Sequence, residues 1–142
     1  MTFLGGGFAY GFAGWLNGRL VSRFGISNTM RAGFSIMILS GILMLVGKIL
    51  IGINLYVIIM PVILFYFGSS LIWPNAYATA FTPFGKIAGY AGALYGFMQV
   101  GGGAVIGGII SHLPALNQLP LALVMLIASL LAWLVYEIVV LR

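Results

Sequence analysis

Long apolar stretches with almost no charge constrain the fold of this chain more than any other feature of its sequence. Between Ala32 and Ser111 the only charged side chains are those of Lys48 and Lys86. Over the whole chain, 63% of the residues are hydrophobic and 5% are charged. A soluble domain carries about 25% charged residues. The sequence therefore predicts an integral membrane protein, and we expect the all-α class because a helix satisfies its own backbone groups in lipid.

The apolar stretches are long enough for five membrane-spanning helices. A bilayer core about 30 Å thick requires roughly 20 apolar residues per helix. We expect a single transmembrane domain over residues 1–142, with helices at about residues 3–21, 32–51, 55–81, 87–111 and 119–141.

The positions of the basic residues predict the orientation. Five crossings place five of the six basic side chains on one side of the membrane: Arg19, Arg23, Arg31, Lys86 and Arg142. Lys48 falls on the other side, near the end of its helix. Because cytoplasmic loops carry an excess of Lys and Arg, we expect the N-terminus outside and the C-terminus in the cytoplasm. The net charge of +5 thus indicates membrane topology and no nucleic-acid partner.

The sequence is poor in groups that do chemistry. Glu137 is the only acidic residue, His112 is the only histidine, and there is no cysteine. We expect Glu137 to be an interfacial charge close to Arg142, with a proton carrier as the alternative. Too few titratable groups remain to build an enzyme site. We therefore expect no enzyme activity, metal or cofactor, and no secretory signal peptide.

Glycines line one face of the fourth predicted helix. Their spacing of three and four residues places them on the same side as Gln99: Gly85, Gly89, Gly92, Gly96 and Gly103. A similar series runs along the first helix: Gly7, Gly11, Gly14 and Gly18. Small residues let membrane helices approach closely, so both faces predict packing seams or, alternatively, surfaces that slide during transport. Gln99 would contact a neighbouring helix or a wet cavity, as a latch or as a ligand contact.

The third predicted helix combines two prolines with a stripe of aromatic residues. Pro61 and Pro74 each remove a backbone hydrogen bond and kink the axis. Ser69, Ser70 and Asn75 lie close enough to help satisfy the freed carbonyls. One face of the helix carries Tyr66, Ser70, Trp73 and Tyr77. Such a stripe is typical of packing, and also of a broad site for apolar compounds.

The segment after the first predicted helix resembles a known motif. Residues 18–25 read GRLVSRFG, which is similar to the loop motif G-x-L-x-D-R-x-G of the major facilitator superfamily. The matching positions are Gly18, Leu20, Arg23 and Gly25. In that family the motif joins two helices on the cytoplasmic side, in agreement with the predicted orientation. Ser22 stands at the acidic position of the motif, so the resemblance does not imply a charge relay here.

A second resemblance covers residues 73–99. The sequence WPNA, followed by AGYAGALYGFMQ at residues 88–99, is similar to a pattern in the second half of Bcr/CflA-type multidrug efflux transporters. This resemblance implies that the five helices correspond to helices eight to twelve of a twelve-helix transporter. It also implies proton-coupled drug efflux by alternating access, in a bacterial inner membrane. The candidate residues of the substrate pathway are Tyr66, Ser70, Trp73, Asn75, Tyr95 and Gln99.

The resemblance leaves the function of this chain open between three hypotheses. The first is a segment of an efflux transporter, embedded in the lipid bilayer, that does not transport alone. It would take a hydrophobic small molecule as substrate once the missing helices are supplied. The alternatives are a non-transporting membrane scaffold or regulatory subunit, and the product of a split or decayed gene.

Overall fold

The computed structural model describes residues 2–112 and 118–140, and it describes the side chains of all of these except residues 2–11 and 110. The described residues form α1 (Thr2–Phe24), α2 (Ile26–Ile51), α3 (Leu55–Phe81), α4 (Ala88–Ser111) and α5 (Leu119–Val135). A short 3-10 helix, η1 (Thr82–Ile87), precedes α4, and a π-helical segment, η2 (Tyr136–Val140), follows α5. No strand occurs within the described ranges.

Three stretches of the described chain are long and apolar enough to cross a membrane: Ile26–Ile51, Leu55–Ile109 and Leu119–Val140. The middle stretch has 55 residues, more than twice the roughly 20 that one crossing needs. It contains α3, the bend at η1 and most of α4. The structure and the composition together confirm an all-helical integral membrane protein.

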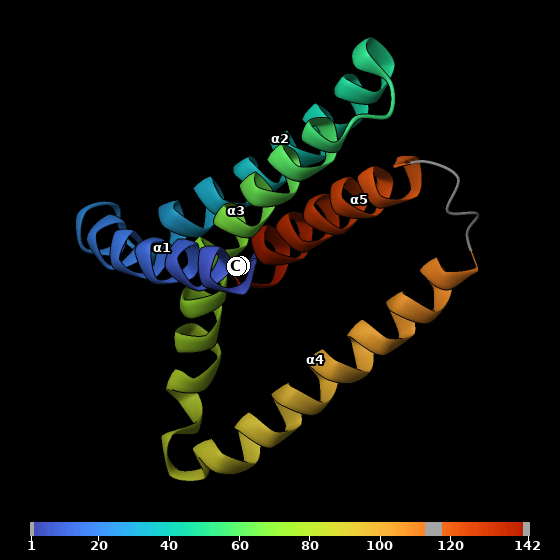
Figure 1. Ribbon diagram of the computed structural model, residues 1–142. Helices are drawn as coiled ribbons and strands as arrows, with labels where there is room; N and C mark the ends of the chain where they lie inside the picture. The colour runs from blue at the N-terminus through green and yellow to red at the C-terminus, as the bar shows by residue number, and fades with distance from the viewer. Residues whose placement is uncertain (1, 113–117, 141–142) are drawn as a thin grey trace.

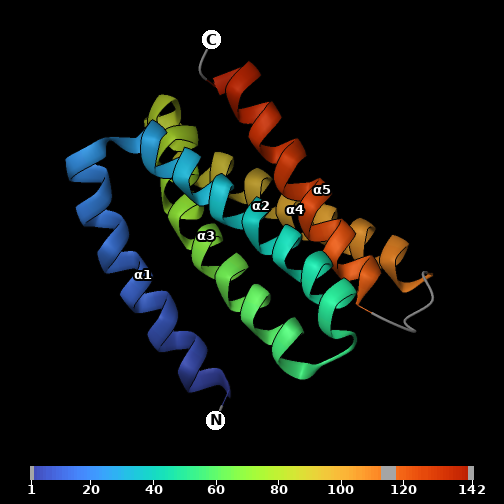
Figure 2. The same cartoon turned by 90° about the horizontal axis from the view of Figure 1, so that it is seen from above.

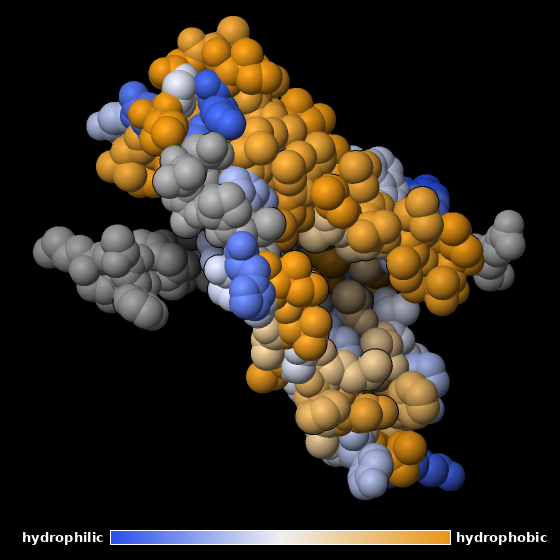
Figure 3. All heavy atoms as spheres, turned by 90° about the vertical axis from the view of Figure 1, so that its right-hand side faces the viewer, coloured by the Kyte–Doolittle hydropathy of each residue, from blue (hydrophilic) through white to orange (hydrophobic). Residues whose placement is uncertain are grey.

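The helices α1, α3, α2 and α5 lie side by side, and α4 lies apart from them (Figures 1 and 2). α2 is the central element, because it packs against α3 on one side and against α5 on the other. α1 contacts α3 and α2, whereas α4 contacts η1 and the end of α3. On the face drawn in Figure 3, hydrophobic side chains cover most of the surface, and hydrophilic ones form smaller patches at its margins and near its middle. This is the surface that a lipid environment requires.

A single residue, Gly25, separates α1 from α2. It adopts a φ of 80°, a left-handed conformation that glycine tolerates because it has no Cβ. The sequence predicted a longer break, between residues 21 and 32, but α2 begins at Ile26. The hydroxyl of Thr29 donates to the Gly25 carbonyl (2.8 Å), and the Asn28 amide donates to the Phe24 carbonyl (3.0 Å). Hydropathy marks the part of a helix that lies in lipid, whereas these polar residues continue the helix beyond it.

Close contact between α2 and its neighbours depends on glycines that the sequence analysis did not single out. A Cβ on Gly68 would lie 2.8 Å from the Gly33 carbonyl oxygen, and a Cβ on Gly33 would lie 2.8 Å from that of Gly68. A Cβ on Gly41 would lie 3.0 Å from the Cβ of Leu126 in α5. Small residues at these points let the backbones touch, as is usual for helix pairs in lipid.

The interior of the α2–α3–α5 layer is mainly apolar. Met44, Ala122 and Met125 form one buried cluster, with Val62 and Phe65 packed against it. The one polar group that joins α2 to α3 in this region is satisfied among the described residues, since the Ser40 hydroxyl donates to the Pro61 carbonyl at 2.6 Å. Packing and satisfied polar groups therefore hold three of the five helices together.

Candidate functional site

The chain reverses direction at an elbow between α3 and α4. Pro83 lies in the first turn of η1, and Phe84 leaves the helical conformation with φ −106° and ψ 23°. Proline has no backbone N–H and so cannot continue the hydrogen bonding of α3. The Thr82 hydroxyl donates to the Ala78 carbonyl at 2.7 Å and satisfies part of the helix end. This geometry directs α4 away from the layer (Figure 1).

Four aromatic rings pack together at the elbow, and Tyr95 of α4 contacts the other three. Its ring lies 5.2 Å from Tyr77, 5.8 Å from Phe81 and 6.2 Å from Trp73, each in an edge-on arrangement. Tyr77 and Phe81 stack on each other at 4.2 Å. Edge-on pairs contribute about 0.5–1.5 kcal/mol each beyond their burial. This aromatic cluster (Trp73, Tyr77, Phe81 and Tyr95) is the main contact that holds α4 to α3.

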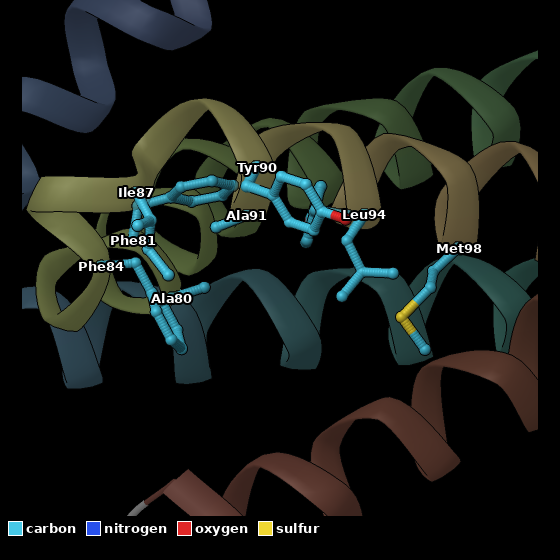
Figure 4. Close-up of a pocket in the computed structure, with 9 residues that line it drawn as sticks. Ala80, Phe81, Phe84, Ile87, Tyr90, Ala91, Leu94 and Met98 are labelled. Carbon is cyan, nitrogen blue, oxygen red and sulfur yellow. The ribbon is translucent and has the colours of Figure 1, made fainter.

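A cavity of about 270 Å³ opens beside the aromatic cluster. Figure 4 shows Ala80, Phe81 and Phe84 at the end of α3 and in η1, with Leu94 and Met98 along α4. The complete lining is Ala80, Phe81, Phe84, Ile87, Tyr90, Ala91, Leu94, Tyr95 and Met98. Ligand pockets are commonly about 300–1,000 Å³ and mostly apolar. The elbow cavity therefore suits part of an apolar, aromatic small molecule, and no charged side chain lines it.

A buried amide pair lies at the level of the aromatic cluster, since Asn75 falls between Trp73 and Tyr77 in α3. The Asn75 side chain donates to the Asn17 Oδ1 atom at 2.8 Å and to the Leu71 carbonyl at 2.7 Å. Both asparagines are buried, with 6% of Asn17 and 5% of Asn75 exposed. Pro74 lies inside α3 and has no N–H to donate to the Ser70 carbonyl. The Asn75 side chain adds its hydrogen bond to the next carbonyl of the helix, that of Leu71. The pair fixes the register of α1 against α3.

The structure brings some of the predicted pathway residues together and separates others. Trp73 and Tyr95 are half-buried in the aromatic cluster, and Asn75 is buried beside α1. Ser70 is buried and donates to the Phe67 carbonyl of its own helix. Tyr66 and Gln99 are exposed and lie outside the cluster. Whether these residues contact a substrate stays a prediction.

The predicted glycine face of α4 meets little of this chain. Gly92 would place a Cβ 3.6 Å from Phe81 and 3.8 Å from the Tyr77 hydroxyl. Within the described residues nothing lies within 4 Å of the Cβ positions of Gly85, Gly89, Gly96 and Gly103. In α1, Gly14 and Gly18 are equally open, and the surroundings of Gly7 and Gly11 lie outside the described side chains. Packing at these two faces stays a prediction.

Three residues of the loop motif, Gly18, Leu20 and Arg23, lie near the end of α1, and the fourth follows it. Gly25 forms the junction, Leu20 is half-buried, and the Arg23 guanidinium lies 5.5 Å from the centre of the Phe24 ring. Ser22, at the acidic position of the motif, donates to the Arg19 carbonyl at 2.9 Å.

A charged contact that the sequence analysis missed joins α2 to the end of α5. Arg31 binds both carboxylate oxygens of Glu137, at 2.7 and 2.9 Å, and the Trp133 indole donates to the same carboxylate at 3.0 Å. Glu137 was expected close to Arg142, which lies outside the described residues. The one signal in the sequence was that Arg31 and Glu137 fall on the same predicted side of the membrane. The pairing itself could not be predicted, because the two residues are 106 positions apart in the sequence.

Comparison with curated proteins finds a relative in Escherichia coli (strain K12), Multidrug resistance protein D. The chain is 34% identical to it over 120 residues, which is 84% of this chain and 30% of the relative. The chain thus spans less than a third of the length of that relative. No family model matches the chain, and no solved structure matches it.

Proposed function

We propose that this chain is a segment of a multidrug efflux transporter of the major facilitator superfamily, of the Bcr/CflA type. The observation that carries the proposal is the 34% identity to a multidrug resistance protein over 84% of the chain. The loop motif at residues 18–25 and the pattern at residues 73–99 support the same assignment. On this proposal the chain resides in a bacterial inner membrane and its helices correspond to helices eight to twelve of the transporter.

We further propose that the chain crosses the membrane five times, with its N-terminus outside. α3 and α4 are 27 and 24 residues long, each enough for one crossing, and they are separated by the η1 elbow. Arg19, Arg23 and Lys86 then share the cytoplasmic side. Because the chain has no cysteine, single cysteines at Ser22, Lys86 and His112 test this directly. A membrane-impermeant thiol reagent should label only the His112→Cys variant from outside, and labelling of Lys86→Cys from outside would refute the orientation.

The elbow supplies the features that a site for hydrophobic drugs needs. The aromatic cluster offers rings with polar tips, and the adjoining cavity is apolar and holds Met98, whose flexible side chain suits varied ligands. A substrate in the cavity would therefore contact Tyr95, whose ring packs on Trp73, and Gln99 lies one turn further along α4. Transport would need further membrane helices, because most of the glycine face of α4 meets no other part of the described chain.

A chimera tests this function. The chain should replace the matching third of Multidrug resistance protein D, and the fusion should be assayed for proton-driven dye efflux from vesicles. We expect efflux from the chimera, none from this chain alone, and none from the relative with that third deleted. Robust efflux by this chain alone would refute the need for further helices. A chimera that reaches the membrane but never transports would refute the transporter assignment and favour a scaffold.

A further inference from the structure

One face of α1 carries aromatic rings followed by arginines. The Phe12 and Trp15 rings lie 5.9 Å apart, and the Arg19 guanidinium lies 4.0 Å from the centre of the Trp15 ring. One turn further, Arg23 lies over Phe24. The order along the helix is therefore apolar aromatic, then indole, then guanidinium. This is the order in which acyl chains, interface and headgroups follow one another across a membrane leaflet.

This aromatic–basic face (Phe12, Trp15, Arg19 and Arg23) points away from the rest of the molecule. Ala13 and Asn17 are 1% and 6% exposed and form the side of α1 that packs against the bundle. At 100° per residue the aromatic–basic face falls on the opposite side of the helix. Phe12 and Trp15 are accordingly 59% and 54% exposed. The face is available to a partner outside this chain.

The two arginines of this face have no acidic partner among the residues that the structure describes. Glu137 is the only acidic residue of the sequence, and Arg31 binds both of its carboxylate oxygens. The ring of Trp15 covers one side of the Arg19 guanidinium and leaves the N–H groups at its edge free to donate. A guanidinium in this arrangement suits a phosphate, which accepts two parallel hydrogen bonds.

We propose that the aromatic–basic face of α1 is a binding site for an anionic phospholipid. The headgroup phosphate would accept hydrogen bonds from Arg19 and Arg23, and the acyl chains would lie along Trp15 and Phe12. Basic side chains at a membrane surface each favour anionic lipid by about fivefold, which corresponds to about 1 kcal/mol per residue. The site does not depend on transport activity, since it requires that α1 lies in a membrane and that no further helix covers this face.

Quenching of Trp15 fluorescence by brominated lipids tests the proposal. The full chain carrying Trp73→Phe and Trp133→Phe would be placed in phosphatidylcholine vesicles with a minor fraction of phosphatidylglycerol. Bromine would be attached to the acyl chains of either lipid, and the relative association constant would be read from the two quenching curves. We expect a preference for phosphatidylglycerol of about 25-fold, reduced about fivefold by Arg19→Gln and close to unity in the double variant with Arg23→Gln.

Three controls keep the outcome decisive. Lys48→Gln removes a charge at the other end of the bundle and should leave the preference unchanged. Arg19→Lys retains the charge and should keep most of the preference, so that a loss in Arg19→Gln is not mistaken for misfolding. Soluble phosphate added in excess should not abolish the preference, and abolition would show a site for free phosphate instead of lipid. Equal quenching by both lipids in the parent chain would overturn the proposal.

Discussion

The glycine contact between α2 and α3 allows a sharp test of what holds this fold together. A Cβ added at Gly68 would lie 2.8 Å from the Gly33 carbonyl oxygen and 3.1 Å from the Met37 backbone nitrogen. Ordinary contact begins at 3.4 Å, so the two helix backbones would have to separate by about 0.6 Å. Overpacking of this kind typically costs about 1–3 kcal/mol, and the contact is made by backbone atoms that cannot rotate away.

The matched control is Gly96→Ala in α4, where nothing in the described chain lies within 4 Å of the added Cβ. Replacing glycine with alanine within a helix favours the helix by up to about 1 kcal/mol. Gly96→Ala should therefore leave the free energy of unfolding unchanged or slightly raised. Gly68→Ala should lower it, with a difference between the two variants of about 2 kcal/mol.

The assay is reversible unfolding of the full chain in mixed micelles with increasing dodecyl sulfate, followed by tryptophan fluorescence. Gly33→Ala should behave like Gly68→Ala, because its Cβ would meet the Gly68 carbonyl oxygen at the same 2.8 Å. If Gly68→Ala and Gly96→Ala have equal free energies of unfolding, the α2–α3 crossing is not a tight seam and the reasoning fails.

Three further predictions concern polar groups. In the same unfolding assay, Asn75→Leu should lower the free energy of unfolding by about 1–3 kcal/mol, because it leaves the buried Asn17 amide without its partner. A double variant with Asn17→Leu should lower it by less than the sum of the two single changes. Glu137→Gln should speed hydrogen exchange in η2, since it removes the charge that binds Arg31; unchanged exchange would show that the pair does not hold η2. In a completed transporter, Gln99→Leu should alter the range of exported dyes at unchanged membrane levels, whereas loss of the protein would support a packing role.

The helices of this chain could be predicted from its sequence because lipid imposes a simple length rule. Runs of about 20 apolar residues are easily recognised in the sequence. In the structure α3 begins at Leu55 and ends at Phe81, as hydropathy indicates. The start of α2 was six residues further along in the prediction than in the structure. Thr29 and Arg31 are polar but helical, and hydropathy does not distinguish a helix end from the edge of the membrane.

Contacts between helices were much harder to predict. Gly33 and Gly68 each lie in a helix without a conspicuous glycine series, so no pattern within either helix marks their meeting. Arg31 and Glu137 are brought together because α5 packs on α2, which is a property of the tertiary arrangement. The aromatic stripe of α3 was visible in the sequence, but its partner Tyr95 depends on the angle of the elbow.

The exposed side chains of α4 indicate a missing contact only where they are polar. Apolar side chains such as Val105 and Ile109 are well exposed in this structure, and acyl chains would cover them without loss. An exposed amide is different, because lipid offers Gln99 no hydrogen-bond partner and an unsatisfied polar group there costs several kcal/mol. The same face carries glycines whose intrinsic helix propensity is poor. These two costs favour a polar surface or another helix packed against the Gln99 face. Gly96→Ala is expected to be neutral in this chain, but it should become destabilising once that helix is supplied.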